Sequence, residues 1–504
     1  MLALLHDTWT SLATGISEAT ARFPGGHDGL TTTVSVVWSL YIAVLAVWII
    51  LQKRAPVSTL SWILSMALLP FAGYVVYYFF GPQRLKKQRL KRLRSQAALY
   101  GETDFARLRD AAADAPAVLR QLARLGTASC DLPISTAVRV DLLVDGAATF
   151  DAIFEAIRAA RHHVHLEYYI FEPDRIGTAL RDLLAQKARE GVQVRLLVDA
   201  MGSKRLGTRF FAPLVAAGGL VGLFHASRIG RRLRPVTNFR THRKIVVCDG
   251  PAGLTGFTGG INITDEEDPR SRADAYHDVH LRIEGGAARM LQMTFLEDWV
   301  YSTGERPREM ALHSARMLPE TPPGDHAVQI LTSGPDNGFE AIHRMYVAAI
   351  NAATSRVWLT TPYFVPGEPG LMALTSAALR GLDVQLLVPR KSDSAIVSAA
   401  ARSYFDELIA AGVKVWEYRA GMLHSKTMLV DDNCAFIGTA NFDNRSFRLN
   451  FEVCAVVYGP ALAEPLARQF TADLDHAKAV AAMRRLPFLR KLGDAAARLF
   501  SPVL

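Results

Sequence analysis

The chain has 504 residues, of which 50% are hydrophobic and 21% are charged. This length exceeds what one hydrophobic core usually serves and predicts two or three domains, and the hydrophobic content excludes a mainly disordered chain. Four scattered cysteines with no zinc-ligand spacing exclude a disulfide framework and fit a reducing compartment.

The formal net charge of +9 would by itself favour a nucleic-acid-binding protein. The positive charge is concentrated, however, in two runs of seven cations that contain no acid, at 84–94 and 228–244. The first run follows an apolar region and the second leads into the motif described below. We therefore expect membrane or substrate binding and no nucleic acid.

Two stretches without ionisable side chains, 29–52 and 55–83, flank Lys53 and Arg54. Each holds an apolar core of the roughly 20 residues that span a bilayer, so we predict transmembrane helices at about 34–51 and 60–80 within an anchor of residues 1–95. A pair of buried helices in a soluble protein is the alternative, and Pro70 leaves a kink or re-entrant hairpin open. The cations at 84–94 place the rest of the chain in the cytoplasm and suit an anionic leaflet.

Beyond residue 100 the pattern is α/β. A helix is expected around 105–125, then strand 164–171, helix 178–190 and strand 192–199. The order strand, helix, strand recurs at 357–364, 371–380 and 382–389, and GVQVRLLV at Gly191 is echoed by GLDVQLLV at Gly381. We predict two duplicated lobes, 96–304 and 327–480, each with a mainly parallel or mixed sheet under helices, joined by a linker at 305–326. Residues 481–504 form a basic amphipathic tail that either lies on a membrane or docks on the domain.

Each lobe carries the same short motif. THRKIVVCD contains His242, Lys244 and Asp249, and LHSKTMLVD contains His424, Lys426 and Asp431 at identical spacing. Glycine-rich segments follow, ending at Asn262 and Asn441. Two copies at equivalent places in a duplication exclude chance.

The chemistry of this pattern points to phosphoryl groups. Residues two apart on a strand share a face, so each histidine lies beside its lysine. Histidine can act as nucleophile or general acid, lysine can hold phosphate oxygens, and asparagine can donate to developing negative charge. The Asp, five residues after Lys, points to the opposite face, which favours a role in organising a turn and leaves its direct role open.

At these motifs the sequence resembles the phospholipase D superfamily and, within it, the bacterial cardiolipin synthases of the phospholipase D type. The resemblance extends over nearly the whole chain and includes KRAPVSTLSWIL, HLEYYIF, GGINI, YHDVHLRIEG, TTPYFVP and GTANFDNRSFRLNFEV. Two departures stand out, namely a longer turn after Asp249 than after Asp431, and Thr439 where the family often has serine.

The resemblance implies a single active site between the lobes, with no metal or cofactor. One histidine forms a phosphohistidine and the other is the acid and base; we assign these roles to His242 and His424, with the reverse order open. The lysines and asparagines would hold the phosphoryl oxygens. Asp278 and Glu452 would orient the histidines, unless they are merely exposed strand carboxylates, and Glu167 is a lesser candidate.

The implied reaction transfers a phosphatidyl group from one phosphatidylglycerol to another, giving cardiolipin and glycerol. The alternatives are a hydrolytic phospholipase D, a phosphatidyltransferase for a different alcohol, a membrane-bound nuclease and a binding-only protein. The partners would be anionic phospholipid and membrane, and the location a multi-pass protein of the bacterial inner membrane. The cations at 228–244 either guide anionic headgroups or form an ordinary solvated loop.

Overall fold

The computed structural model describes residues 26–51, 56–68, 119–207, 209–224, 239–305, 317–482, 484 and 486–502. The chain divides into an N-terminal unit, 1–84 with 233–235, and a main unit that comprises 85–232 and 236–504. Of the cationic run at 228–244, residues 239–244 are described; residues 225–238 and the run at 84–94 lie outside the described residues.

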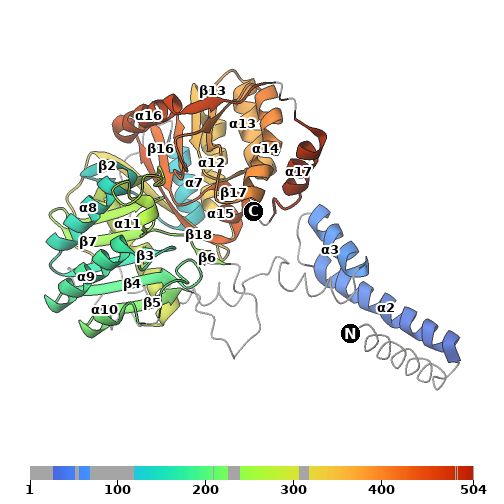
Figure 1. The fold of residues 1–504 in the computed structure, drawn as a ribbon, viewed down its shortest axis with the longest axis horizontal. Helices are drawn as coiled ribbons and strands as arrows, with labels where there is room; N and C mark the ends of the chain where they lie inside the picture. Colours follow the sequence, from blue (N-terminus) through green and yellow to red (C-terminus); the bar gives the residue numbers. More distant parts are fainter. Residues whose placement is uncertain are drawn as a thin grey trace. The chain divides into compact units, whose positions relative to one another are not determined.

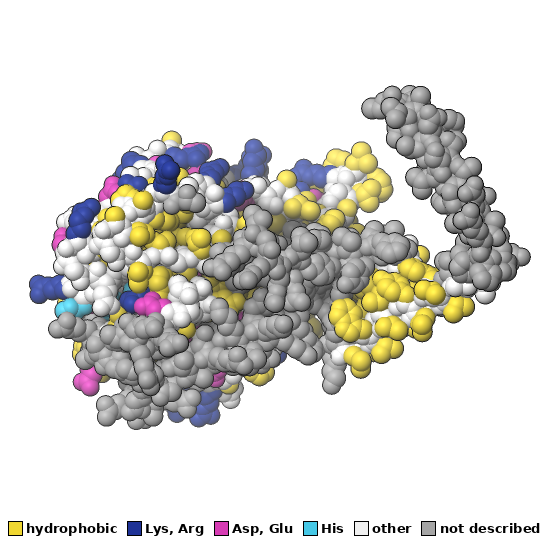
Figure 2. Space-filling view, turned by 90° about the horizontal axis from the view of Figure 1, so that it is seen from below, with side chains coloured by type: hydrophobic (Ala, Val, Ile, Leu, Met, Phe, Trp, Pro, Cys, Tyr) yellow, Lys and Arg dark blue, Asp and Glu magenta, His cyan; other side chains and the backbone are white. Residues whose placement is uncertain are grey.

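The N-terminal unit contains helices α2 (Gly26–Ile50) and α3 (Pro56–Leu68). They pack through Ile49 and Met66, while Val36, Leu40 and other apolar side chains of α2 are exposed, and Figure 2 shows hydrophobic side chains gathered along this long helix. Within the described residues, no helix combines the length and the hydropathy needed to cross a membrane. The structure thus does not show the spans expected at 34–51 and 60–80, and residues 69–80 lie outside the described ranges.

The first lobe of the main unit is built on a seven-stranded sheet of order β2-β9-β8-β7-β3-β4-β5 (Figure 1). β3, β4 and β5 are parallel, and the other neighbours are antiparallel. The strands are β2 (Arg139–Val144), β3 (His163–Tyr168), β4 (Gln193–Asp199), β5 (Leu220–Phe224), β7 (Ile245–Gly250), β8 (Gly253–Gly259) and β9 (Val279–Glu284). The helices are α8 (Asp145–Ala159), α9 (Arg175–Arg189), α10 (Ala212–Ala216) and α11 (Gly286–Thr303).

The second lobe repeats this order as β10-β18-β16-β15-β11-β13-β14, with β1 and β19 added at the two edges. The strands are β1 (Ile134–Ala137), β10 (His326–Ser333), β11 (Arg356–Thr360), β13 (Asp383–Pro389), β14 (Lys414–Tyr418), β15 (Thr427–Val430), β16 (Cys434–Gly438), β18 (Asn450–Tyr458) and β19 (Ala477–Ala479). The helices are α7 (Arg120–Cys130), α12 (Ala341–Ala352), α13 (Gly367–Leu379), α14 (Ala395–Ala410), α15 (Asn444–Arg448), α16 (Pro460–Asp475) and α17 (Phe488–Arg498). A separate pair is β12 (Phe364–Val365) with β17 (Phe442–Asp443).

The duplication predicted from the sequence is confirmed by these two equivalent strand orders. The repeated octapeptides form β4 and β13, the parallel strands that follow β3 and β11 in each sheet. Both strands are buried on both faces, which explains their continuous apolar character.

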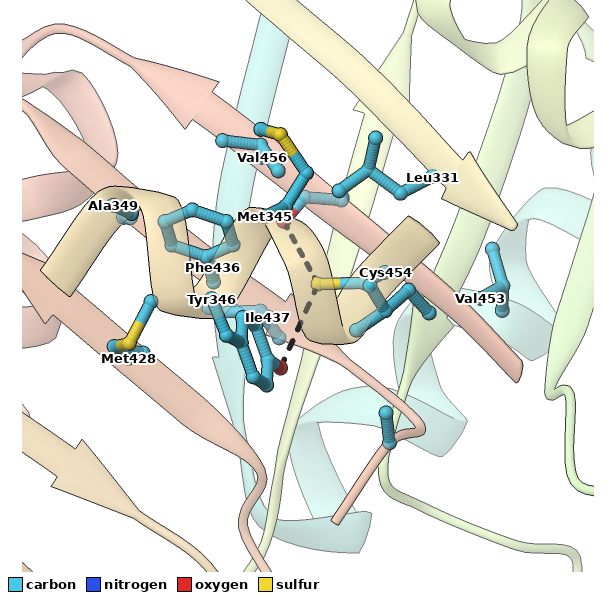
Figure 3. Packing of buried hydrophobic residues seen from close by; sticks show 14 of the residues in the cluster. Leu331, Met345, Tyr346, Ala349, Met428, Phe436, Ile437, Val453, Cys454 and Val456 are labelled. Carbon is cyan, nitrogen blue, oxygen red and sulfur yellow. Dashed lines mark hydrogen bonds between the residues drawn. The ribbon is translucent and has the colours of Figure 1, made fainter. Parts of the chain in front are cut away.

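One core joins the lobes. α11 is buried along nearly its whole length and packs on strands of both sheets, including β8 and β10. In the second lobe, α12 covers the sheet, and Tyr346 packs over Phe436 and Cys454 (Figure 3). Burying a large apolar side chain typically contributes about 1.5–3 kcal/mol. Because α11 buries several such side chains in the core that both sheets share, this core fixes the lobes against each other.

Three elements differ from the sequence expectation. The strand expected at 357–364 stops at Thr360, because Pro362 lacks the N–H that a ladder needs, and resumes as β12. The strand expected at 164–171 ends at Tyr168. Finally β1, which precedes the first lobe's strands, pairs with β10 and so belongs to the second sheet.

The C-terminal helix α17 docks on α14 and also presents an apolar face. Asp494 pairs with Arg402 at 2.7 Å, and the hydroxyls of Tyr404 and Ser501 lie 3.0 Å apart. In contrast, Leu489 and Leu499 are 78% and 80% exposed. The helix is therefore attached through its polar and small residues and leaves its large apolar side chains outside.

Candidate active site

Two short contacts between the lobes position the motif histidines. β6 (Arg240–Thr241) pairs with the start of β18, and the His242 N–H donates to the Phe451 carbonyl at 2.8 Å. Conversely, His277 of the first lobe forms an isolated β-bridge with Leu423 of the second lobe, and the His424 N–H donates to the His277 carbonyl, also at 2.8 Å. Each histidine is thus held by the backbone of the opposite lobe.

The same contacts place an acid from the opposite lobe on each imidazole. His242 Nδ1 lies 3.0 Å from Glu452 Oε2, and His424 Nδ1 lies 2.7 Å from Asp278 Oδ2. Burial raises the pKa of both carboxyls, but their positively charged and hydrogen-bonding neighbours outweigh it and the pKa of each is lowered. An ionised carboxylate only accepts, so each Nδ1 carries a proton and each Nε2 lone pair is free.

The motif lysines are fully buried beside the histidines. Lys244 Nζ donates to the His242 carbonyl at 3.0 Å, and Lys426 Nζ donates to the His424 carbonyl and to Asp278. Burial, followed by the charge of Lys426, lowers the pKa of Lys244 to about 7, and burial lowers the pKa of Lys426. An anionic ligand would restore the full charge of both ammonium groups.

Burial also keeps the histidines neutral. It is the largest influence on both imidazoles and lowers the pKa of His242, and it lowers the pKa of His424 to about 4, with Lys426 as the next cause. Tyr169 and Tyr276 flank the two rings, with ring centroids 5.0 Å from His242 and 5.6 Å from His424. At neutral pH the site therefore offers two unprotonated Nε2 atoms.

Glu267 belongs to this cluster and was missed by the sequence reasoning. Its Oε1 accepts from the backbone and side chain of Asn262, each at 3.1 Å, and lies 3.9 Å from His424 Nδ1. Burial and then the charge of Asp278 raise the pKa of Glu267 to about 8, so it holds a proton at neutral pH. The sequence holds one signal for it, namely that Glu267 stands five residues after Asn262 as Ser446 stands five residues after Asn441. In the structure both side chains accept from the backbone N–H of that asparagine.

The predicted asparagines both lie in the buried part of the site. Asn262 is held by Glu267, and the Asn441 side-chain oxygen has no hydrogen-bond partner among the described residues. Thr439, which replaces the common serine, donates its hydroxyl to Glu452 and so keeps the function of that group.

Asp249 and Asp431, the motif acids whose direct role the sequence left open, accept hydrogen bonds at turns of the backbone. The Asp249 carboxylate accepts from the backbone N–H groups of 161–163, each at 2.9 Å. Asp431, with φ of 51°, accepts from both the backbone and the hydroxyls of Thr354 and Ser355. Each lies at the end of its strand remote from the lysine, because five residues of strand extend about 16 Å. Both therefore organise turns.

Glu167, the lesser candidate for orienting a histidine, contacts the segment that precedes His242. The Thr241 hydroxyl donates to it, and burial followed by the charge of Asp298 raises its pKa well above the usual range. It thus holds Thr241 of β6, the residue directly before His242.

Among the described residues, one group has the spacing to hold a metal ion. Ligand atoms of Glu267, Asp278 and His424 lie within 4.8 Å of one another. The Lys426 ammonium already donates to Asp278, and Glu267 carries a proton, so positive charge and a proton occupy the places that a cation would fill.

The duplicated lobes and the two interlocked His-x-Lys pairs define a protein of the phospholipase D class. A family model described as cardiolipin synthase, PLD-like domain, matches residues 153–289 and 346–474, and a phospholipase D-nuclease N-terminal model matches 40–82. The chain belongs to this family of phospholipase D-type cardiolipin synthases.

Full-length relatives agree with that placement. The chain is 40% identical over 479 residues to a cardiolipin synthase of Geobacillus kaustophilus, covering 93% of both chains. It is 38% identical to cardiolipin synthase 1 of Bacillus anthracis, covering 95% of both. The crystal structure of a phosphatidylserine synthase of Haemophilus influenzae matches 76% of this chain and all of its own, with a TM-score of 0.58 at 16% identity, and so shares the fold.

Proposed function

We propose that the chain transfers a phosphatidyl group from one phosphatidylglycerol to the terminal hydroxyl of another, giving cardiolipin and glycerol. The observation that carries the proposal is the crosswise pairing of His242 with Glu452 and of His424 with Asp278 around two buried lysines. This arrangement offers one nucleophile, one acid and base, and cations for the phosphoryl oxygens in a single site.

In the first step, His242 Nε2 attacks phosphorus, the bond from phosphorus to the glycerol oxygen breaks, and His424 gives that oxygen a proton. Glu452 stabilises the His242 imidazolium as the nitrogen–phosphorus bond forms. The anionic phosphodiester raises the pKa of His424 on binding, since it adds negative charge beside a neutral imidazole. Glu267, which holds a proton at neutral pH, lies 3.9 Å from His424 Nδ1, so the assignment of the acid to His424 agrees with the protonated group beside it.

In the second step the acceptor hydroxyl attacks phosphorus, the nitrogen–phosphorus bond breaks, and His424 takes the hydroxyl proton. Lys244 and Lys426 hold the phosphoryl oxygens in both steps, with Asn262 and Asn441 as further donors. Because the transfer has two steps, glycerol leaves the position beside His424 before the acceptor hydroxyl enters it.

The test follows three products from purified protein and radiolabelled phosphatidylglycerol, namely cardiolipin, glycerol and phosphatidic acid. We expect equal amounts of cardiolipin and glycerol. Phosphatidic acid with no cardiolipin would show a hydrolase instead. Trapping label on the His424→Ala variant but never on the His242→Ala variant, using a lipid with a good leaving group, would support the assigned roles, and the reverse pattern would exchange them.

The enzyme acts, in this proposal, at an anionic bilayer on the cytoplasmic side of the inner membrane. The apolar N-terminal region and the basic run at 84–94 support this location. α17 adds a second contact, since Phe488, Leu489 and Leu499 are more than 75% exposed beside Arg490 and Lys491. Apolar residues next to cations are typical of helices that lie on lipid surfaces.

Substitution of the α17 face tests that contact in the full chain. Leu489→Ser with Leu499→Ser should slow turnover of phosphatidylglycerol in vesicles and leave turnover of a monomeric short-chain phosphatidylglycerol unchanged. Met372→Ser with Leu379→Ser is the matched control, because these side chains of α13 are 72% and 74% exposed. Equal rates for the α17 variant and the wild type on vesicles would contradict the contact.

A further inference from the structure

A cavity of about 430 Å³ lies beside Tyr276, the tyrosine that flanks His424, and is not used by the mechanism above. It lies at the carboxyl ends of β13 and β14, where α/β sheets commonly bind ligands. Tyr276 forms part of its wall, and the ring of Tyr276 lies 5.6 Å from that of His424. Met422, also on the wall, precedes His424 by two residues. The cavity therefore begins one aromatic ring away from the acid and base.

The cavity is lined by cations that are available to a ligand. Arg390 and Lys391 follow β13 directly and Arg419 follows β14; all three side chains are exposed, and none has an ion pair among the described residues. Of its two acids, Asp274 pairs with Arg272 at 2.7 Å, whereas Asp393 accepts from the neutral Tyr363 hydroxyl and keeps its negative charge, so three cations face one uncompensated carboxylate. The lining thus carries net positive charge.

This charge distinguishes the second lobe from the first. After β4, the first-lobe equivalent of β13, the residues equivalent to Arg390 and Lys391 are Ala200 and Met201. The duplication placed similar strand ends in both lobes, and only the lobe that carries His424 has cations directly after this strand.

The two alcohols that meet His424 differ in charge. Glycerol leaves as a neutral molecule, whereas the incoming alcohol is the headgroup of a second phosphatidylglycerol and brings its own phosphodiester. Three carbons separate its attacking hydroxyl from that phosphodiester, a reach of about 6 Å at ordinary single-bond lengths. The two anionic phosphates repel each other at that separation. Lys244 and Lys426 are taken by the phosphate being transferred, so the second one needs other cations.

We propose that this cavity, the acceptor cavity, binds the phosphodiester of the acceptor phosphatidylglycerol through Arg390, Lys391 and Arg419. The inference rests on the proposed transfer reaction and adds where the acceptor is recognised. With its phosphate in the cavity, the acceptor places its terminal hydroxyl between His424 and the phosphohistidine. The oxygen–phosphorus bond forms, the bond from phosphorus to His242 breaks, and the proton passes to His424. The cavity thereby favours an anionic alcohol over water.

The test is a competition between acceptors in one reaction. The full chain is given radiolabelled phosphatidylglycerol in mixed micelles with 1-butanol, and cardiolipin, phosphatidylbutanol and phosphatidic acid are counted together. In the variant Arg390→Gln, Lys391→Gln, Arg419→Gln the ratio of cardiolipin to phosphatidylbutanol should fall at least about tenfold, the effect of losing charge-assisted contacts to one phosphate. The summed rate of all three products should change much less, since formation of the phosphohistidine does not use the cavity.

The matched control replaces three exposed cations that lie outside the cavity, Arg120→Gln, Arg189→Gln and Arg468→Gln. It removes the same net charge and should keep the wild-type ratio. An unchanged ratio in the cavity variant, or a parallel fall of all three products, would overturn the acceptor cavity. If the wild type itself makes phosphatidylbutanol and phosphatidic acid but no cardiolipin, the proposed transfer reaction fails, which is a separate result.

Discussion

The crosswise pairing predicts that an acid of one lobe controls the histidine of the other. Glu452→Gln should impair the nucleophile His242, and Asp278→Asn should impair the acid and base His424, because each change removes the charge to which Nδ1–H donates. Both substitutions keep the size of the side chain. They therefore test the interaction and leave the packing of the buried strands in place.

The magnitude follows from the contacts. Glu452 and Asp278 are fully buried and lie 3.0 and 2.7 Å from their imidazoles. A hydrogen bond to a charged group contributes about 1.5–3 kcal/mol, which is roughly a 10- to 150-fold change in rate. Loss of the correct tautomer adds to this, and the corresponding change in the Ser-His-Asp triad costs about 10⁴. We expect losses between about 10² and 10⁴ with phosphatidylglycerol.

The assay separates the two histidines by the leaving group of the donor. With phosphatidyl-p-nitrophenol, whose leaving group needs no proton, the first-turnover burst of nitrophenol should stay slow in Glu452→Gln and recover most of its rate in Asp278→Asn. The burst is measured because later turnovers still need His424 as the base of the second step. Asp141→Asn, an acid of β2 that pairs with Arg139, is the control for general effects of charge removal. Recovery in Glu452→Gln and none in Asp278→Asn would exchange the roles, and equal behaviour of the two variants would refute the reasoning.

Three other predictions concern groups around the site. His277 lies between Asp145 and Asp473 at 2.7 and 2.8 Å; burial lowers its pKa, but these two partners outweigh it and raise the pKa to about 10. Because the folded pKa lies above the ordinary 6.5, the stabilisation by this histidine is complete below pH 6.5 and is lost as the pH rises through 10. The wild-type Tm should therefore fall more between pH 7 and 10 than the Tm of His277→Gln. Parallel curves of Tm against pH would contradict this prediction. Asp431→Ala should lower the free energy of unfolding, measured by denaturant titration, by about 2 kcal/mol or more because its hydrogen bonds are lost. Asp431→Asn should lower it less, because asparagine tolerates the positive φ of this position. Equal losses in the two variants would argue against the turn role. Chelation with EDTA should leave turnover unchanged, since Lys426 and the Glu267 proton supply the positive charge in the Glu267–Asp278–His424 group, whereas a loss that added metal restores would show a metal site.

Much of this protein could be predicted from patterns with a fixed period. The strand β4 and its repeat β13 were recognisable because both are continuous apolar runs between glycines, and the duplication followed from their similarity. His242, Lys244, His424 and Lys426 were identified by the repeated spacing of the motif, although they lie directly before β7 and β15 and not on the strands that the spacing suggested. The same alternation predicted the opposite face for Asp249 and Asp431 and left their direct role open, and the hydrogen bonds that define their turn role came from the structure.

Partners distant in sequence were decided by the tertiary structure. Asp278 and Glu452 were expected to orient histidines, but which acid serves which histidine depends on the short pairings of β6 with β18 and of His277 with Leu423, which no local pattern encodes. Glu267 acquires its raised pKa only from burial beside Asp278, and the cations of the acceptor cavity converge only because β13 and β14 end side by side. Local sequence thus determines which residues share a face of one element, whereas the charge, protonation and reach of the site arise where two lobes bury those faces against each other.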